Sequence, residues 1–214
     1  PLAPGCSLSR SQRQKAAAAN GAVEFADPLM TELQRRFGPA PFRPHAAEVQ
    51  PAYPTLVSSI VGQQLSGKAA ETIWKRLEQR FAVEPAVLAA ADPDDLRALG
   101  LSRAKVSFVH DLSRFALEGG LDDLEHQSDA EIIAHLTQVK GIGVWTVQMF
   151  LMFGLRRPDV WPVLDLGVRR GLERVYGVSD RAGLEALGER FRPFRSHAAW
   201  YMWRVVENAG AGGL

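Results

Sequence analysis

Residues 136–170 read LTQVKGIGVWTVQMFLMFGLRRPDVWPVLDLGVRR, and this stretch decides the fold that we expect. A polar helical segment runs into the turn VKGIG at residues 139–143, and a nearly all-apolar helical segment leaves it. Further along, the isolated acidic residue Asp165 stands between an apolar segment and a basic helical segment. The stretch therefore predicts two helices joined by a tight turn, with an acid at the start of a third helix.

Helical patterns recur through the rest of the chain with short loops between them. No segment alternates with period two for long enough to predict a strand. Residues that can cap the start of a helix are Asp27, Ser66, Ser128, Asp180 and Ser196. The proline-rich stretch at residues 38–54 is expected to be a connector, not a continuous helix. We predict an all-α fold.

The predicted helices fall into two lobes. Residues 27–54 together with 158–214 form a terminal lobe, and residues 55–157 form a middle lobe that contains the hairpin. A cleft between two such lobes is a common place for an active site. Residues 1–26 hold few large apolar side chains, so we expect a disordered N-terminal fringe.

Composition bounds the function only loosely. The 214 residues carry a net charge of +1, so bulk charge does not indicate a nucleic-acid-binding protein. The single cysteine, Cys6, excludes an internal disulfide and a multi-cysteine metal site, which fits a reducing cytoplasm. There is no apolar run long enough to span a membrane and no secretory signal pattern. Any functional hypothesis must rest on local motifs.

The turn at residues 139–143 allows two interpretations. Glycines spaced as Gly141 and Gly143 suit left-handed backbone and the close approach of another backbone. The N–H groups at the start of the following helix suit an anionic oxygen such as a phosphate, and Lys140 adds charge. The alternative is a tight corner that only joins two helices. Asp165 also allows two interpretations, because most aspartates at such a position are ordinary N-caps.

Five features together narrow these alternatives. The turn VKGIG followed by Val-Trp-Thr-Val resembles the helix–hairpin–helix element of DNA repair glycosylases. Asp165 lies where that superfamily has its catalytic aspartate. The segments SIVGQQLS (59–66), GLSRAK (100–105) and FRPFRS (191–196) are similar to the bacterial 3-methyladenine DNA glycosylase II (AlkA) type. The resemblance covers residues 28–208.

The resemblance implies a two-lobed helical enzyme of base excision repair. It would flip an alkylated base, such as 3-methyladenine or 7-methylguanine, out of duplex DNA and hydrolyse its N-glycosidic bond. Asp165 would stabilise the oxocarbenium-like sugar and activate water. Backbone N–H bonds and the positive helix end favour the anionic form that this role needs. No redox cofactor, small-molecule cofactor or catalytic metal is expected.

Trp145 stands where strand-cutting relatives carry a lysine nucleophile. A tryptophan cannot form a Schiff base, so the resemblance implies a monofunctional glycosylase without lyase activity. Its ring can stack on a cationic base, although core packing is the alternative. The expected base pocket comprises Trp145, Met149, Phe191 and Phe194. Met149 replaces a tyrosine of the AlkA type, which implies a less polar pocket.

The resemblance also assigns the contacts to DNA. The expected wedge residues, which fill the gap left by the flipped nucleotide, are Gln63, Gln64 and Leu65. Simple alignment favours Gln64, and a polar helix end is the alternative. Expected DNA-backbone contacts are Lys140, Gly141, Gly143, Thr146 and Arg169, with Lys105 as a further candidate. A structural Na⁺ or K⁺ would be held by the backbone carbonyls of Thr137, Val139 and Gly141 when DNA is bound.

The expected partner is double-stranded DNA that contains alkylated bases, and we expect a monomer with no membrane association. The protein would be cytoplasmic, and associated with the nucleoid in a bacterium. The AlkA type has a β-rich N-terminal lobe, for which the residues before the first predicted helix are too few. One alternative function is a non-enzymatic helix–hairpin–helix DNA-binding module. Another is a glycosylase for oxidised or mismatched bases, against which Trp145 argues.

Overall fold

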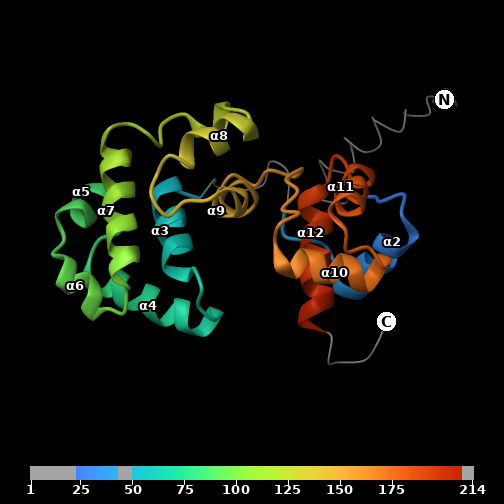
Figure 1. Cartoon of the computed structure of the whole chain (residues 1–214), viewed down its shortest axis with the longest axis horizontal. Helices are drawn as coiled ribbons and strands as arrows, with labels where there is room; N and C mark the ends of the chain where they lie inside the picture. The colour runs from blue at the N-terminus through green and yellow to red at the C-terminus, as the bar shows by residue number, and fades with distance from the viewer. Residues whose placement is uncertain (1–22, 43–49, 209–214) are drawn as a thin grey trace, which may run out of the picture. The chain divides into compact units, whose positions relative to one another are not determined.

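The computed structural model describes residues 23–42 and 50–208, and every regular element in these ranges is a helix (Figure 1). The predicted all-α fold is therefore confirmed. The chain divides into two compact units: residues 49–155 form unit 2, and residues 1–48 with 156–214 form unit 1. The lobe boundaries predicted after residues 54 and 157 lie close to these limits. No helix in the described ranges is long and apolar enough to cross a membrane.

Unit 2 is built around helix α3, Ala52–Gly62, which packs against four other elements of the unit. The core-facing side chains of α3 are Tyr53, Leu56, Val57, Ile60 and Val61. Around it lie α4 (Gly67–Arg80), α5 (Pro85–Ala90), α6 (Pro93–Ala98), α7 (Arg103–Leu117), η1 (Leu124–His126), α8 (Asp129–Leu136), α9 (Val144–Met149) and the π-helical turn η2 (Phe150–Gly154). A central apolar helix with its neighbours on several sides gives unit 2 a core of its own.

Local signals in unit 2 account for most helix ends. Ser66 accepts a hydrogen bond from the Ala69 N–H at the start of α4, and Ser128 forms the predicted capping box with Glu131. The connector predicted at residues 38–54 is wrong at its C-terminal end, where α3 already begins. The helix begins at Ala52 because Pro54 lies in the first turn, where a missing N–H removes no intrahelical bond.

Unit 1 contains α2 (Pro28–Phe37), α10 (Leu166–Tyr176), α11 (Arg181–Arg190) and α12 (Arg195–Glu207). Asp27 ties three of these helices together. Its carboxylate caps α2, accepts a 3.1 Å hydrogen bond from the Tyr176 hydroxyl on α10, and pairs with Arg190 of α11 at 2.8 Å. Because the Asp27 side chain is buried, these partners replace the water that it loses.

Helices α10 and α12 approach each other closely, and a glycine makes this possible. A Cβ at Gly171 would stand 2.6 Å from the backbone oxygen of Met202, closer than such atoms can pack. Gly167 lies one turn earlier on α10 and is crowded by Trp203 of α12 in the same way. This close packing brings the side chains of α12 to the start of α10.

Two predictions at the edges of unit 1 are wrong. Residues 1–22 of the predicted disordered fringe lie outside the described residues, but Val23 is buried and the Phe25 ring packs edge-on against Phe191 and Tyr201. These two apolar side chains extend the core of unit 1. Ser196 does not cap the last helix, because α12 already starts at Arg195 and the Ser196 hydroxyl is buried elsewhere.

Candidate functional site

Asp165 is the N-cap of α10. Its Oδ1 accepts a 2.8 Å hydrogen bond from the Val168 N–H, which is the N-cap geometry that the sequence predicts. The carboxylate is half-buried, and its neighbours Leu164 and Leu166 are 59% and 57% exposed. The acid is therefore flanked on both sides by exposed apolar side chains.

A second donor orients the same carboxylate. The indole N–H of Trp203, on α12, donates to Asp165 Oδ1 at 2.7 Å. Trp203 passes over Gly167, where an added Cβ would stand 2.6 Å from the indole Cδ1. Trp203 is not among the site residues that the sequence predicts. Its bond to Asp165 joins positions 38 residues apart, and no local spacing could have indicated it.

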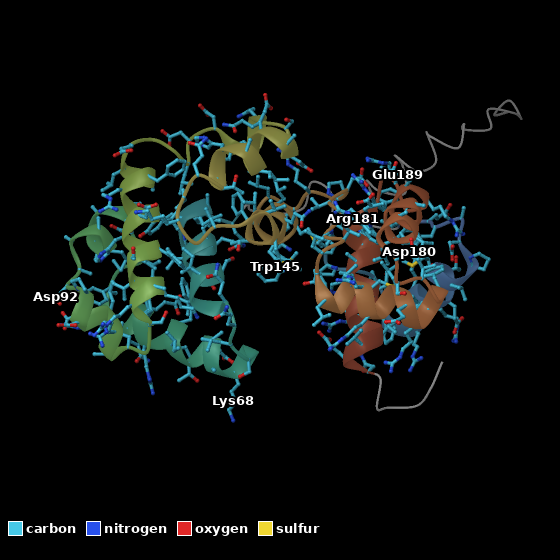
Figure 2. The ribbon with its side chains drawn as sticks, viewed as in Figure 1. Lys68, Asp92, Trp145, Asp180, Arg181 and Glu189 are labelled. Atoms are coloured by element: carbon cyan, nitrogen blue, oxygen red, sulfur yellow. The ribbon has the colours of Figure 1, made fainter. Side chains whose placement is uncertain are left out.

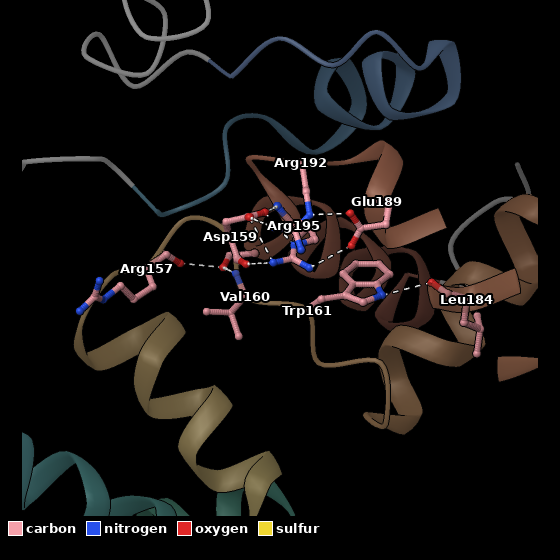
Figure 3. A network of polar contacts seen from close by, with 9 residues as sticks. Arg157, Asp159, Val160, Trp161, Leu184, Glu189, Arg192 and Arg195 are labelled. Carbon is pink, nitrogen blue, oxygen red and sulfur yellow. Dashed lines mark hydrogen bonds and ion pairs between the residues drawn. The ribbon is translucent and has the colours of Figure 1, made fainter. Parts of the chain in front are cut away.

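The segment that leads to Asp165 is fastened to the start of α12 (Figure 3). Asp159 accepts hydrogen bonds from Arg192 at 2.8 Å and from Arg195 at 2.8 Å. The buried Ser196 hydroxyl accepts from the Val160 N–H and donates to the Arg157 carbonyl. The main chain before Asp165 is therefore held by Arg195 and Ser196 of α12, the same helix that supplies Trp203.

The hairpin in unit 2 has the predicted tight turn between α8 and α9. Gly141 has a φ of +80°, and an added Cβ would collide with the ring of Phe108 on α7. Gly143 differs from the expectation, because its φ of −95° is open to any residue. An added Cβ at Gly143 would meet no atom of the protein within 4 Å. The protein's own packing therefore does not require a glycine there, which leaves room for another molecule.

The hairpin is attached to α7 through a carboxylate. Asp111 Oδ2 accepts a 2.9 Å hydrogen bond from the Lys140 backbone N–H. This bond is the main reason that the pKa of Asp111 lies below its ordinary value, and Arg114 contributes further. The Lys140 side chain is exposed, as is that of Arg169 in the first turn of α10. Both remain available to an external anion.

The loop between α3 and α4 contains the predicted wedge residues. Gln64 is exposed and has a φ of +58°, and Leu65 is 39% exposed. Gln63 is directed differently, because its amide Nε2 donates to the Gly141 carbonyl at 2.8 Å. The structure thus separates Gln63, which contacts the hairpin, from Gln64 and Leu65, which face solvent.

Trp145 and Met149 lie one turn apart on the same face of α9. The Trp145 side chain is 41% exposed, so it is not part of the core of unit 2 (Figure 2). Met149 is half-buried beside it. An exposed indole next to a thioether is an apolar surface on which a planar ring can stack.

Other site predictions are wrong. Phe191 is 1% exposed and its ring packs against Phe25, Trp161 and Tyr176, while Phe194 is 5% exposed beside His197. These rings form the core of unit 1 and do not present a face to a base. Thr146 is also buried, so its side chain is not a surface donor for phosphate.

Lys105 is likewise not a free surface charge. Its ammonium donates to the carbonyls of Val61 and Gln63, each at 2.7 Å. Burial lowers the pKa of this lysine. The bonds satisfy carbonyls at the C-terminal end of α3, where a cation is favourable.

Comparison with known proteins identifies this arrangement. Residues 57–194 match the model of the HhH-GPD superfamily base excision DNA repair proteins. The matched range contains the hairpin, the loop between α3 and α4, and Asp165. The chain belongs to the HhH-GPD superfamily.

Individual relatives agree with this assignment. The chain is 34% identical to DNA-3-methyladenine glycosylase 1 of Schizosaccharomyces pombe over 180 residues, which covers 78% of each protein. The solved structure of the 3-methyladenine DNA glycosylase Mag1 from the same yeast, in complex with abasic DNA, is similar with a TM-score of 0.74 and 30% identity. The match covers 85% of this chain and 93% of that one. The predicted family is confirmed.

A further relative shows that the match is not always complete. The chain is 33% identical over 169 residues to a Bacillus subtilis protein but spans only 59% of that protein's length. Membership of the HhH-GPD superfamily fixes the fold and the repair context.

Proposed function

We propose that this chain is a monofunctional DNA N-glycosylase that flips alkylated bases of the 3-methyladenine and 7-methylguanine type out of duplex DNA and hydrolyses their N-glycosidic bond. The observation that carries the proposal is the carboxylate of Asp165, held at one oxygen by the Val168 N–H and the Trp203 indole N–H. An N-cap needs only the first of these two donors. The second fixes the orientation of the acid, which a catalytic group requires.

The chemistry needs one well-placed carboxylate. An N-alkylated purine is cationic, so it leaves as a neutral base when the bond between C1′ and its nitrogen breaks. Positive charge then develops on the sugar, and the Asp165 carboxylate stabilises it. Water forms the new bond to C1′ and gives up one proton to the carboxylate. The products are the free base and an abasic site.

The residue at position 145 argues against strand cleavage. A lyase step needs an amine that attacks C1′ to form a Schiff base, and an indole has no such amine. The 41% exposed ring of Trp145 instead offers a π-face to an electron-poor, cationic base. Met149, one turn later on α9, extends this surface.

DNA would be gripped at the hairpin. The first N–H groups of α9 have no carbonyl one turn before them within the helix, and they point out of its N-terminus. The bare surface at Gly143 permits a phosphate to approach these groups. Lys140 and Arg169 are exposed cations that add salt-dependent affinity. Gln64, exposed at the tip of its loop, is the proposed wedge.

The hairpin carbonyls fit a monovalent cation. Thr137, Val139 and Gly141 supply neutral oxygens, the ligand type that Na⁺ and K⁺ accept. Val139 O and Gly141 O each accept one hydrogen bond, from the Ile142 N–H and from Gln63 respectively. A carbonyl oxygen has two lone pairs, so each retains capacity for a cation. When bound, the ion would supply positive charge to a DNA phosphate.

The proposal is tested by base release from methylated duplex DNA. Asp165→Asn keeps a capping oxygen but removes the charge, so it should bind DNA as the wild type does and lose at least about a hundredfold in excision rate. Asp180→Asn is the matched control, because Asp180 caps α11 through the Gly183 N–H at 2.9 Å. The control should excise normally.

The products and the controls decide between the functions. Release of alkylated bases without strand nicking supports the monofunctional glycosylase. Near-normal excision by Asp165→Asn would refute the catalytic role of this carboxylate. DNA binding by the wild type without any base release would indicate a non-enzymatic DNA-binding module.

A further inference from the structure

The loop of residues 63–66, between α3 and α4, is held from two sides within unit 2. Lys105 of α7 binds the end of α3 and the start of the loop, since its ammonium donates to Val61 O and Gln63 O at 2.7 Å each. A 3.2 Å hydrogen bond from the Leu65 N–H to the Gly62 carbonyl closes the turn. The backbone of the loop therefore has a defined shape in the absence of any ligand.

The second fastening is the side chain of Gln63. Its amide Nε2 donates to the Gly141 carbonyl at 2.8 Å and lies 3.4 Å from the Thr146 hydroxyl oxygen. Gly141 is in the hairpin turn, and Thr146 is a buried residue of α9. One side chain thus connects the loop to both sides of the hairpin, 78 and 83 residues further along the chain.

The two fastened elements present different groups to the outside. The hairpin exposes the Lys140 side chain and the open space beside Gly143. The loop exposes Gln64, whose backbone is left-handed. Left-handed backbone is uncommon for glutamine and is kept only where neighbouring contacts impose it. The bonds made by Gln63 and Lys105 on the residues just before Gln64 are such contacts.

We propose that Gln63 is a positioning residue that locks the wedge loop to the phosphate-binding hairpin, with Lys105 as the second lock. The proposal rests on the proposed function. Insertion of a side chain into a duplex must offset the free energy of unstacking and unpairing one nucleotide. A loop that is already ordered loses little further entropy on insertion, so more of the contact energy drives base extrusion. Binding of the hairpin to the DNA phosphates then determines where the wedge residue enters the duplex.

The test uses Gln63→Glu in the full-length protein. The substitution keeps the shape of the side chain, but it replaces the donating amide with a carboxylate that repels the Gly141 carbonyl. Single-turnover release of 7-methylguanine is measured from two duplexes. In one the damaged base lies opposite cytosine, and in the other it lies opposite a tetrahydrofuran abasic analogue, where less pairing must be broken.

A role in extrusion predicts a difference between these substrates. With cytosine opposite, Gln63→Glu should lower the rate by roughly tenfold or more, and with the abasic analogue by less than about threefold. Lys105→Met, which keeps the apolar stem and removes the donor, should give the same difference. Gln79→Glu, the same change at an exposed position of α4, should affect neither substrate. Thermal unfolding and affinity for undamaged duplex verify that the variants are folded.

Two results would overturn the positioning role. One is an unchanged rate with cytosine opposite. The other is an equal loss on both substrates, which would mean that Gln63 supports the unit or the chemistry in general. Neither result contradicts the proposed function, as long as the wild type releases the base. A wild type that releases no base from either duplex would instead refute the proposed function itself.

Discussion

The environment of Asp165 differs from that of Asp180, the capping aspartate of α11. Asp180 accepts a backbone N–H from its own helix. Asp165 has the equivalent backbone bond and, in addition, the indole N–H of Trp203 from another helix. The Trp203 indole lies against Gly167. A larger residue at position 167 would displace the indole from Asp165.

Trp203→Phe should reduce excision while leaving DNA affinity unchanged. The substitution removes the 2.7 Å donor to Asp165 but keeps a smaller aromatic ring. A hydrogen bond to a charged group contributes about 1.5–3 kcal/mol, which corresponds to roughly a 10- to 100-fold lower single-turnover rate. Trp200→Phe is the matched control on the same helix, because its ring packs against Tyr201 and Arg204. An equal loss in both variants would mean that the bond has no specific role.

At the scale of secondary-structure elements, the hairpin gains its rigidity from α7 and the wedge loop. Phe108 packs beneath Gly141, Asp111 accepts the Lys140 N–H, and Gln63 binds the Gly141 carbonyl. A five-residue turn of this kind has little stability of its own. Three separate contacts fix it, so the groups that it exposes are ordered before DNA arrives.

Asp111 makes the attachment of the hairpin sensitive to acid. Its pKa is lowered in the folded protein, chiefly by the Lys140 N–H bond. Because the pKa is lower in the folded protein, the ionised Asp111 carboxylate stabilises the fold above the pKa of the unfolded chain, which is near 3.8. This stabilisation is lost as the pH falls through the pKa of the folded protein. We expect Asp111→Asn to lower the free energy of unfolding by about 1 kcal/mol at pH 7.

The difference between wild type and Asp111→Asn should narrow as the pH falls below about 4. Urea unfolding at pH 7, 5 and 3 measures this directly. Asp95→Asn serves as the control, since Asp95 forms only an exposed ion pair with Arg80 at 3.5 Å and should have a smaller effect at pH 7. A difference for Asp111→Asn that stays constant over this range would contradict the assigned contact.

At the scale of the whole molecule, the proposed functional groups are divided between two units. The hairpin, the wedge loop and Trp145 belong to unit 2, while Asp165 and Trp203 belong to unit 1. Unit 2 is one continuous segment whose ends meet, as the Gln50 N–H bonds to the Gly154 carbonyl at 3.3 Å. Unit 1 is assembled from both ends of the chain around α2, α10 and α12.

A fragment of residues 49–155 should therefore fold alone. We expect it to show helical circular dichroism and cooperative unfolding, because it contains a complete core and adjoining ends. It should bind undamaged duplex DNA with an affinity that falls as salt is added. It should release no base, because Asp165 is not part of it. A fragment that is unfolded would show that unit 2 depends on unit 1.

Particular residues show which features of the fold and the site the sequence alone predicts. The helix starts at Asp27, Ser66 and Ser128 were predictable because a cap acts within one turn of its own residue. The hairpin and Asp165 were recognisable for the same reason. Phe191 and Phe194 were misassigned because an aromatic at helical spacing has the same pattern whether it faces a core or a ligand.

The sequence by itself determined most of the helices and their caps and the repair family, since these depend on short segments of contiguous residues. It also marked Asp165 as the proposed acid. Only the tertiary structure decided what each of these groups contacts. It placed Trp203 on Asp165, Gln63 on the hairpin carbonyl and Lys105 on the end of α3. Each of these bonds joins residues at least 38 positions apart. Such pairs meet only when helices pack, and no local spacing encodes them.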